Sequence, residues 1–143
     1  MFSWADFESA APELAAFGRE RIERHGFMLL GTTRRDGTAR ISPVEVRIVE
    51  EQLAMNLVRG STKVHDLRRD PRPLLHAPVL SSTDPVDEFK LRGRAVEIEN
   101  EALRAAVALW EPPPEFDAFA VDIEEVAFVE WEKGEMRVTR WSR

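Results

Sequence analysis

Cysteine and tyrosine are both absent from the 143-residue sequence. Without cysteine, the chain has no disulfide scaffold, no thiol nucleophile, and no cysteine ligands for zinc or an iron–sulfur cluster. Long hydrophobic runs are missing as well, since none approaches the ~20 apolar residues of a membrane span. The first residues carry Asp6 and Glu8 and lack the basic start of a signal peptide. We therefore expect a cytoplasmic protein.

Positive charge is the next scarce feature. Lys and Arg number 20 against 26 Asp and Glu, which gives a formal net charge of −6 and an isoelectric point near 5.2. This balance argues against a nucleic-acid-binding surface. The hydrophobic share of 43% and the charged share of 32% are typical of globular chains. At this length we expect one domain with a sizeable core.

The motifs of several common enzyme classes are also missing. The sequence contains neither the GxGxxG of dinucleotide-binding folds nor a P-loop, and no serine lies in a GxSxG elbow. The three histidines, His25, His65 and His76, do not have the spacing of a metal site, and their spacing gives no support to haem ligation. Adjacent carboxylates such as Glu50 and Glu51 point to opposite faces of a strand, which is typical of solvated charge rather than of an acid/base pair.

Hydrophobic periodicity predicts an opening helical segment, followed by short strands with two further helices among them. The predicted helices span residues 3–7, 13–25, 63–69 and 101–110. The predicted strands span residues 27–33, 39–49, 52–58, 74–80, 89–99, 119–132 and 136–141. Turn signals at Asp36-Gly37 and Lys133-Gly134 join neighbouring strands into hairpins.

Irregularities inside three predicted strands indicate bends. The apolar residues of 89–99 change parity midway, and Gly93 lies between the two halves, so we expect a bulge or sharp bend there. The strand at 119–132 switches phase around Glu124-Glu125 in the same way. Pro43 cannot donate to a β-ladder, so we expect it at an edge, a bulge or a bend.

Short strands, hairpins and internal bends together favour a mainly β fold, an antiparallel barrel with helices packed outside it. The regular alternation of strands and helices in a doubly wound sheet is missing. We expect one domain over residues 1–143, made of a helical segment at 1–26 and a barrel with peripheral helices at 27–143.

One stretch combines the features of an anion site. The strand 52–58 ends at a glycine, and Ser61, Thr62 and Lys63 follow where a helix begins. The start of a helix has free backbone N–H groups and the positive end of the dipole. Arg40 lies on the neighbouring strand of the meander, so we expect it to approach the same corner. The same residues also suit an ordinary helix cap with a solvated lysine.

A family resemblance rests on the order and spacing of three motifs. They are Arg40-Ile41-Ser42-Pro43-Val44, Gly60-Ser61-Thr62-Lys63 and the run from Leu67 to Arg72. From about Phe27 to Glu99 the chain resembles the pyridoxamine 5′-phosphate oxidase-like, FMN-binding split-barrel superfamily, with its flavin and deazaflavin oxidoreductases. This resemblance implies a split β-barrel that forms a homodimer, with two cofactor sites at the subunit interface and a small-molecule substrate.

The resemblance also implies which residues contact the FMN. It puts the isoalloxazine along one strand, the ribityl chain beside the end of the next, and the phosphate at the helix start. The isoalloxazine would lie along Arg40, Ile41, Ser42 and Pro43, and the ribityl chain beside Asn56, Leu57 and Val58. The phosphate would be bound by Ser61, Thr62 and Lys63, and also by Arg40. Thr62 departs from the family, because many members have a basic residue there. The same fold also serves deazaflavin (F420) enzymes, haem proteins and non-catalytic carriers, so these stay as alternatives.

Overall fold

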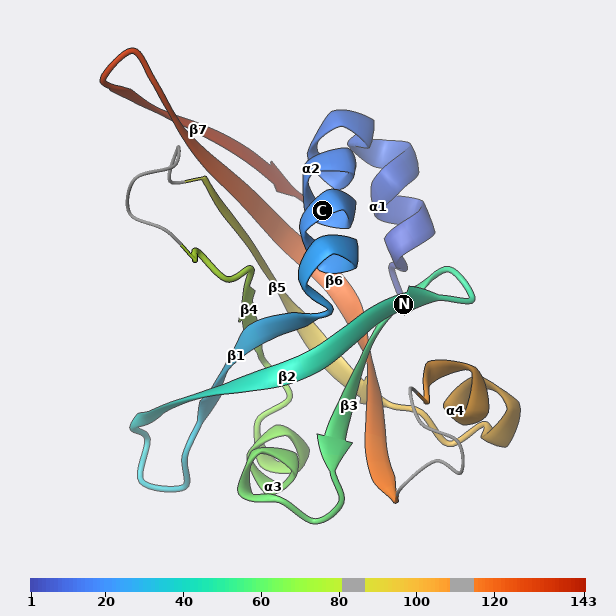
Figure 1. Ribbon diagram of the computed structural model, residues 1–143. Helices are drawn as coiled ribbons and strands as arrows, with labels where there is room; N and C mark the ends of the chain where they lie inside the picture. The colour runs from blue at the N-terminus through green and yellow to red at the C-terminus, as the bar shows by residue number, and fades with distance from the viewer. Residues whose placement is uncertain (81–86, 109–114) are drawn as a thin grey trace.

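The computed structural model describes residues 1–80, 87–108 and 115–143 (Figure 1). Its helices are α1 (Trp4–Ala10), α2 (Pro12–His25), α3 (Thr62–Arg69) and α4 (Glu101–Val107). Its strands are β1 (Phe27–Thr33), β2 (Ala39–Val49), β3 (Gln52–Val58), β4 (Leu74–His76), β5 (Glu88–Glu97), β6 (Phe116–Glu132) and β7 (Glu135–Ser142). The predicted mainly β class is confirmed.

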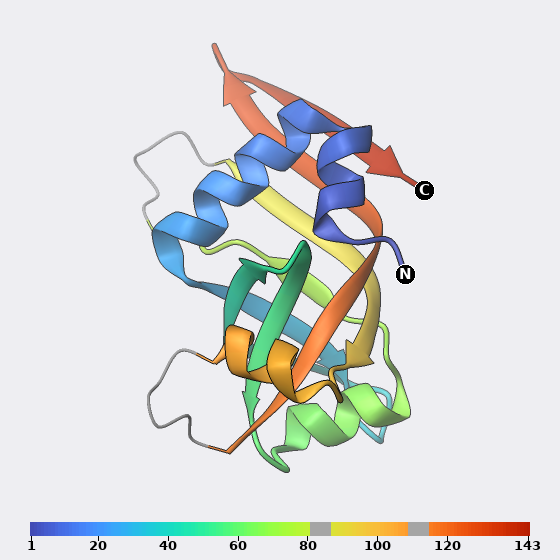
Figure 2. The same cartoon turned by 90° about the vertical axis from the view of Figure 1, so that its right-hand side faces the viewer.

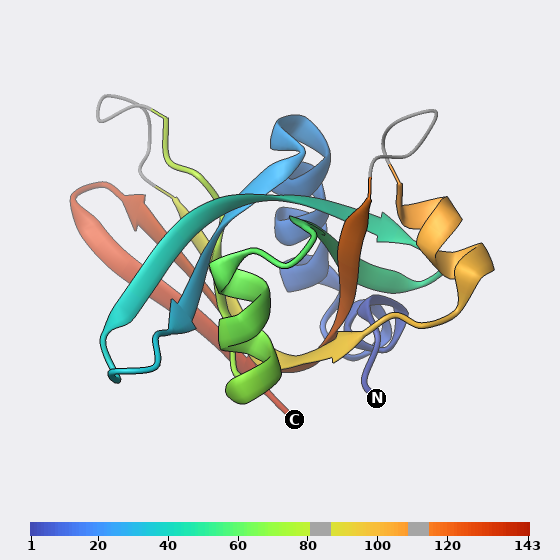
Figure 3. The same cartoon turned by 90° about the horizontal axis from the view of Figure 1, so that it is seen from below.

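The strands form one antiparallel sheet that closes on itself. Its order is β3-β2-β1-β4-β5-β6-β7, and an additional pairing of β3 with β6 completes a barrel. Seen from below, the strands surround a common interior (Figure 3). β7 lies outside the ring and pairs with β6. The fold is the predicted antiparallel split barrel, and β1, β2 and β3 form the predicted meander.

One irregularity lies where the sequence predicted a bulge, and Pro43 lies at a predicted edge. The register of β5 against β6 shifts between Arg92 and Gly93, so that Glu124 is the extra residue on β6. Gly93 is required there, because a Cβ on this residue would lie 2.1 Å from the carbonyl oxygen of Asp122. Pro43 pairs with Leu29 of β1 but lies beyond the part of β2 that pairs with β3, which is a local edge.

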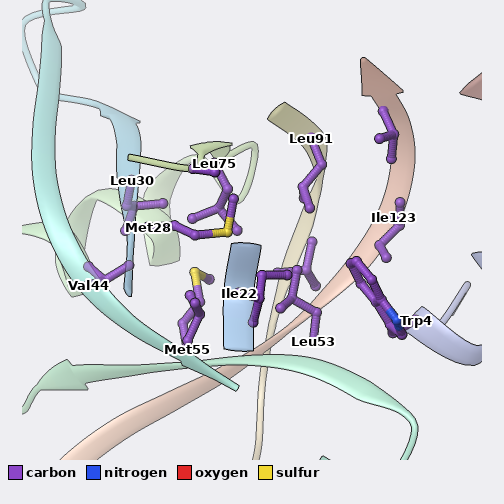
Figure 4. Packing of buried hydrophobic residues seen from close by; sticks show 14 of the residues in the cluster. Trp4, Ile22, Met28, Leu30, Val44, Leu53, Met55, Leu75, Leu91 and Ile123 are labelled. Carbon is purple, nitrogen blue, oxygen red and sulfur yellow. The ribbon is translucent and has the colours of Figure 1, made fainter. Parts of the chain in front are cut away.

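The core lies inside the barrel and under its helical cover. Met28, Leu30, Val44, Met55 and Leu75 point toward one another in the interior (Figure 4). The helices α1 and α2 cover one end of the barrel, and α3 lies at the opposite end (Figure 2).

The first helix is held by a capping box and by its buried face. The Ser3 hydroxyl accepts from the backbone N–H of Asp6, whose carboxylate accepts in turn from the backbone N–H of Ser3. Trp4 and Phe7 are buried in the same cluster as the barrel residues. No helix within residues 1–80, 87–108 and 115–143 is long and apolar enough to cross a membrane.

Several predicted boundaries differ from the structure: for example, the strand predicted at residues 89–99 ends at Glu97, and the one predicted at 119–132 begins at Phe116. The strand predicted at residues 74–80 ends at His76. Pro78 has no N–H with which to continue a ladder, and Ala77 makes the last backbone bond, donating to Phe89. The helix predicted at residues 101–110 ends at Val107, because Ala108 already has an extended backbone, and residues 109 and 110 lie outside the described part of the chain.

Candidate functional site

A cavity of about 540 Å³ lies between the turn that joins β1 to β2 and the helix α3. Figure 1 and Figure 3 both show this turn beside α3. The lining residues are mostly charged, and they are Arg34, Arg35, Asp36, Arg40, Thr62, His65, Asp66 and Arg69. Of the residues that the sequence suggested for a cofactor, Arg40 and Thr62 meet here. Four arginines against two aspartates leave the walls with a net charge of about +2 when His65 is neutral.

Four of the lining residues share one face of α3. Thr62, His65, Asp66 and Arg69 follow the spacing i, i+3, i+4 and i+7, which places side chains above one another on a helix. Sequence reasoning did not use this spacing, although it was available. It identified the start of the helix and missed the polar face that follows.

Asp66 organises the cavity from beneath. Its side chain is nearly fully buried, with the residue 3% exposed. Its Oδ2 accepts from Arg40 Nε at 2.7 Å and from the Thr32 hydroxyl at 2.9 Å, and its Oδ1 accepts from Arg69 at 3.1 Å. One carboxylate thus fixes two arginines from elements that are far apart in the sequence.

The charge of Asp66 is secured by the groups around it. Burial by itself raises the pKa of a carboxyl, but the hydrogen bonds from Arg40, Arg69 and Thr32 outweigh burial, and the pKa of Asp66 lies below its ordinary value of 3.8. Asp66 is therefore ionised at neutral pH. The two terminal nitrogens of Arg40 can still bind another group, because only Nε is bonded to Asp66 and the side chain remains 27% exposed.

The β1–β2 turn brings two further arginines. The Asp36 carboxylate accepts from the backbone N–H of Thr38 at 3.0 Å and from its hydroxyl at 2.6 Å, which fixes the turn. The Thr38 hydroxyl and backbone bonds hold the pKa of Asp36 below its ordinary value. Arg34 and Arg35 extend from this turn into the cavity wall. Sequence reasoning identified this stretch only as a turn and missed both arginines.

The start of α3 carries an unused hydroxyl. Ser61 is the N-cap residue, yet its side chain makes no capping bond, and its Oγ is buried with no hydrogen-bond partner within the described residues. Gly60 precedes it with φ at +65°, the left-handed conformation that glycine tolerates. Ser61 and Lys63 flank Thr62 in the chain but do not line the cavity itself.

An exposed apolar surface extends from the cavity along β2. Ile41 is 71% exposed and Val58 is 63% exposed, and Leu29 is also exposed. Pro43 pairs with Leu29, and Ile41 pairs with Gly31, so alternation puts these side chains on the outer face of the barrel. Ser42 points the other way and is half-buried. Gly31, the register partner of Ile41, adds no side chain to this surface.

The remaining suggested residues on β3 lie elsewhere. Leu57 is fully buried in the core. Asn56 is nearly buried beneath α4, where its amide donates to the Val107 carbonyl at 2.8 Å. Of the three residues suggested on β3, Val58 is the one that the structure leaves open to a ligand.

Comparison with known proteins identifies a family and several solved structures that are similar to this chain. A family model described as pyridoxamine 5′-phosphate oxidase matches residues 14–130. No curated protein sequence matches the chain. Solved structures of the same fold include a Clostridium acetobutylicum protein related to general stress protein 26, of the pyridoxinephosphate oxidase family. That protein is 11% identical with a TM-score of 0.68, over 87% of this chain and 92% of that one.

Two further structures show what proteins of this fold bind. A haem-binding protein from Mycobacterium smegmatis is 20% identical with a TM-score of 0.64, over 85% of this chain and 55% of that one. PhzG from Burkholderia lata, solved with tetrahydrophenazine-1-carboxylic acid, is 15% identical with a TM-score of 0.58, over 96% of this chain and 92% of that one. At these identities the likeness is one of fold.

Proposed function

The chain belongs to the pyridoxamine 5′-phosphate oxidase family, and from this premise we propose that it is an FMN-binding oxidoreductase acting on a small molecule. The observation that carries the proposal is the arginine-lined cavity at the start of α3. A phosphate monoester carries a charge of about −2 near neutral pH, and the walls of the cavity carry about +2.

The donors around the cavity fit a phosphate group. Arg40 is oriented by Asp66 and retains free nitrogens, and guanidinium groups match phosphate oxygens in fork geometry. The free backbone N–H groups of the first turn of α3 add neutral donors at the Thr62 end of the cavity. Arg34 and Arg35 supply positive charge where Thr62 replaces the basic residue of many family members.

The outer face of β2 suits the ring of the cofactor. Ile41, Pro43 and Val58 present exposed apolar side chains, and an isoalloxazine is a flat, largely apolar group. The bound flavin supplies the hydride and electron chemistry. The protein orients the ring, excludes water from one side of it and holds the phosphate.

We propose that the same apolar face is covered by a second copy of the chain in a homodimer. An isoleucine that is 71% exposed, together with an exposed valine and leucine, is costly in water, and burial of these side chains favours association. The purified protein is expected to sediment as a dimer, measured by analytical ultracentrifugation across a dilution series. Replacement of Ile41 with glutamate is expected to shift the distribution to monomers, and an unchanged monomer mass for the wild type contradicts the dimer.

Removal of one cavity arginine should weaken FMN selectively. We expect Arg35→Gln to lower FMN affinity about tenfold or more, the value of a charge-assisted contact to phosphate. Arg35 makes no ion pair within the described residues, so the fold should be unaffected. The measurement is titration of the apoprotein with FMN, followed by flavin fluorescence.

Riboflavin provides the matched control, because it has the same ring and no phosphate. Its affinity should be equal for the wild type and for Arg35→Gln, and Arg24→Gln on the exposed face of α2 should change neither ligand. If FMN and riboflavin bind the wild type equally, the cavity is not a phosphate site. If neither binds, while F420 does in a parallel titration, the cofactor is the deazaflavin.

A further inference from the structure

A second cavity, of about 520 Å³, lies on the outer face of the sheet across β4, β5, β6 and β7. It shares no lining residue with the arginine cavity beside α3. Two cross-strand rows build it from register partners. One row is His76, Lys90, Ala127 and Arg140, and the other is Leu74, Arg92, Glu125 and Ser142. Its size is that of ordinary small-molecule pockets, which hold about 300–1,000 Å³.

The charge of this pocket opposes that of the whole molecule. Lys90, Arg92 and Arg140 face one carboxylate, Glu125, in a chain whose formal net charge is −6. Lys90 is partly neutralised, since its Nζ lies 3.2 Å from Glu88 at the rim. Within the described residues, Arg92 and Arg140 form no ion pair, not even Arg92 with its register partner Glu125. Two guanidinium groups are therefore free to bind an anion.

His76 adds a polar group of known orientation. Its Nδ1 lies 2.6 Å from the Ala77 carbonyl oxygen, which can only accept, so Nδ1 carries the hydrogen. Nε2 lies 3.9 Å from the Glu88 carboxylate and is left as the second polar atom of the ring. The histidine thus presents one fixed edge at the pocket.

Apolar groups complete the walls. Of the apolar residues that line the pocket, Leu74 and Ala127 lie in the two outer rows, so their side chains share the face of the charged groups. Trp141 alternates with these rows, and its ring lies on the other side of the sheet, where it stacks on Phe2 with ring centroids 5.3 Å apart. The guanidinium groups of Arg92 and Arg140 beside the apolar side chains of Leu74 and Ala127 match a ligand that has an acidic group on an apolar body.

From this juxtaposition we propose that the pocket of β4–β7 binds a small organic anion, whose carboxylate or phosphate lies between Arg92 and Arg140 and whose apolar body lies on Leu74 and Ala127. The proposal stands independently of the flavin, because it uses none of the residues of the cavity beside α3.

The test is a titration of the ¹⁵N-labelled full-length protein, without FMN, at constant ionic strength. Sodium benzoate is expected to shift the amide signals of His76, Lys90, Arg92 and Arg140 in a saturable manner. Benzyl alcohol, which has the same ring and no charge, should shift them far less. Inorganic phosphate, titrated in parallel, distinguishes a preference for phosphate from one for carboxylate.

The variants separate the pocket from general attraction to positive charge. Arg92→Gln with Arg140→Gln should weaken benzoate about tenfold or more, whereas Arg137→Gln, on the same strand as Arg140 but outside the pocket, should leave it unchanged. Both variants change exposed side chains, and an otherwise unaltered amide spectrum verifies the fold. Equal benzoate affinity in the double variant, shifts confined to other residues, or no saturable shift with either anion overturns the proposal.

Discussion

Gly93→Ala is expected to destabilise the protein by about 3 kcal/mol or more. The added methyl group would lie 2.1 Å from the carbonyl oxygen of Asp122 and 3.2 Å from the Cα of Ile123, both backbone atoms of the adjacent strand. Neither can rotate away as a side chain would. The substitution therefore has to separate β5 from β6 at the bulge, which breaks hydrogen bonds of the most extensive pairing in the barrel. Urea unfolding followed by tryptophan fluorescence measures the loss.

Gly31→Ala is the matched control for this prediction. Gly31 also lies in a strand of the same sheet, but its added Cβ would meet Leu74 at 3.5 Å, an ordinary contact. A change within about 0.5 kcal/mol is expected there. A loss for Gly93→Ala as small as that of the control would mean that the bulge adapts, and that the register shift does not depend on glycine.

The bulge shows how far local patterns determine this fold. The parity change on either side of Gly93 is visible in the sequence because alternation must fail where an extra residue enters a strand. The bounds of β1, β2 and β3 also agree residue for residue with the prediction. A hairpin can be predicted from local sequence, because it requires only alternating apolar residues and a turn signal between the strands. The closure of the barrel is different. Ala54 pairs with Ala120, and no local pattern specifies which distant strand completes the ring.

The residues of the cavity beside α3 likewise fall into some that the sequence predicted and others that it did not. The glycine and hydroxyl residues before the helix were enough to suggest an anion site, and Arg40 was expected nearby because adjacent strands of a meander lie side by side. Arg34 and Arg35 were missed, because their position depends on how far the β1–β2 hairpin twists over α3. Asp66 was missed because a buried carboxylate on a short, polar helix has no signature apart from its partners. Sequence reasoning thus located the corner without the residue that organises it.

Asp66→Asn is expected to lower the free energy of unfolding by about 2–3 kcal/mol at neutral pH. The amide keeps the shape of the side chain but removes the charge, and its NH₂ group faces an arginine N–H where an acceptor was. Arg40 and Arg69 lose their common anion, and the nearly buried Thr32 hydroxyl loses a strong acceptor. Asp70→Asn is the control, because the partner of Asp70 is the well-exposed Arg72, and a much smaller loss is expected.

The pH dependence gives this prediction a second, independent readout. Since the pKa of Asp66 is lowered in the folded state, its stabilising contribution is complete above the ordinary value of 3.8 and is lost as the pH falls through the lower, folded-state value. The asparagine variant has no such contribution to lose. The difference in unfolding free energy between wild type and Asp66→Asn, measured with urea from about pH 7 to about pH 3, should therefore be constant at first and shrink at the acidic end. A difference that stays constant to the lowest pH would mean that the loss comes from the amide NH₂ group facing an arginine N–H and not from the missing charge of Asp66.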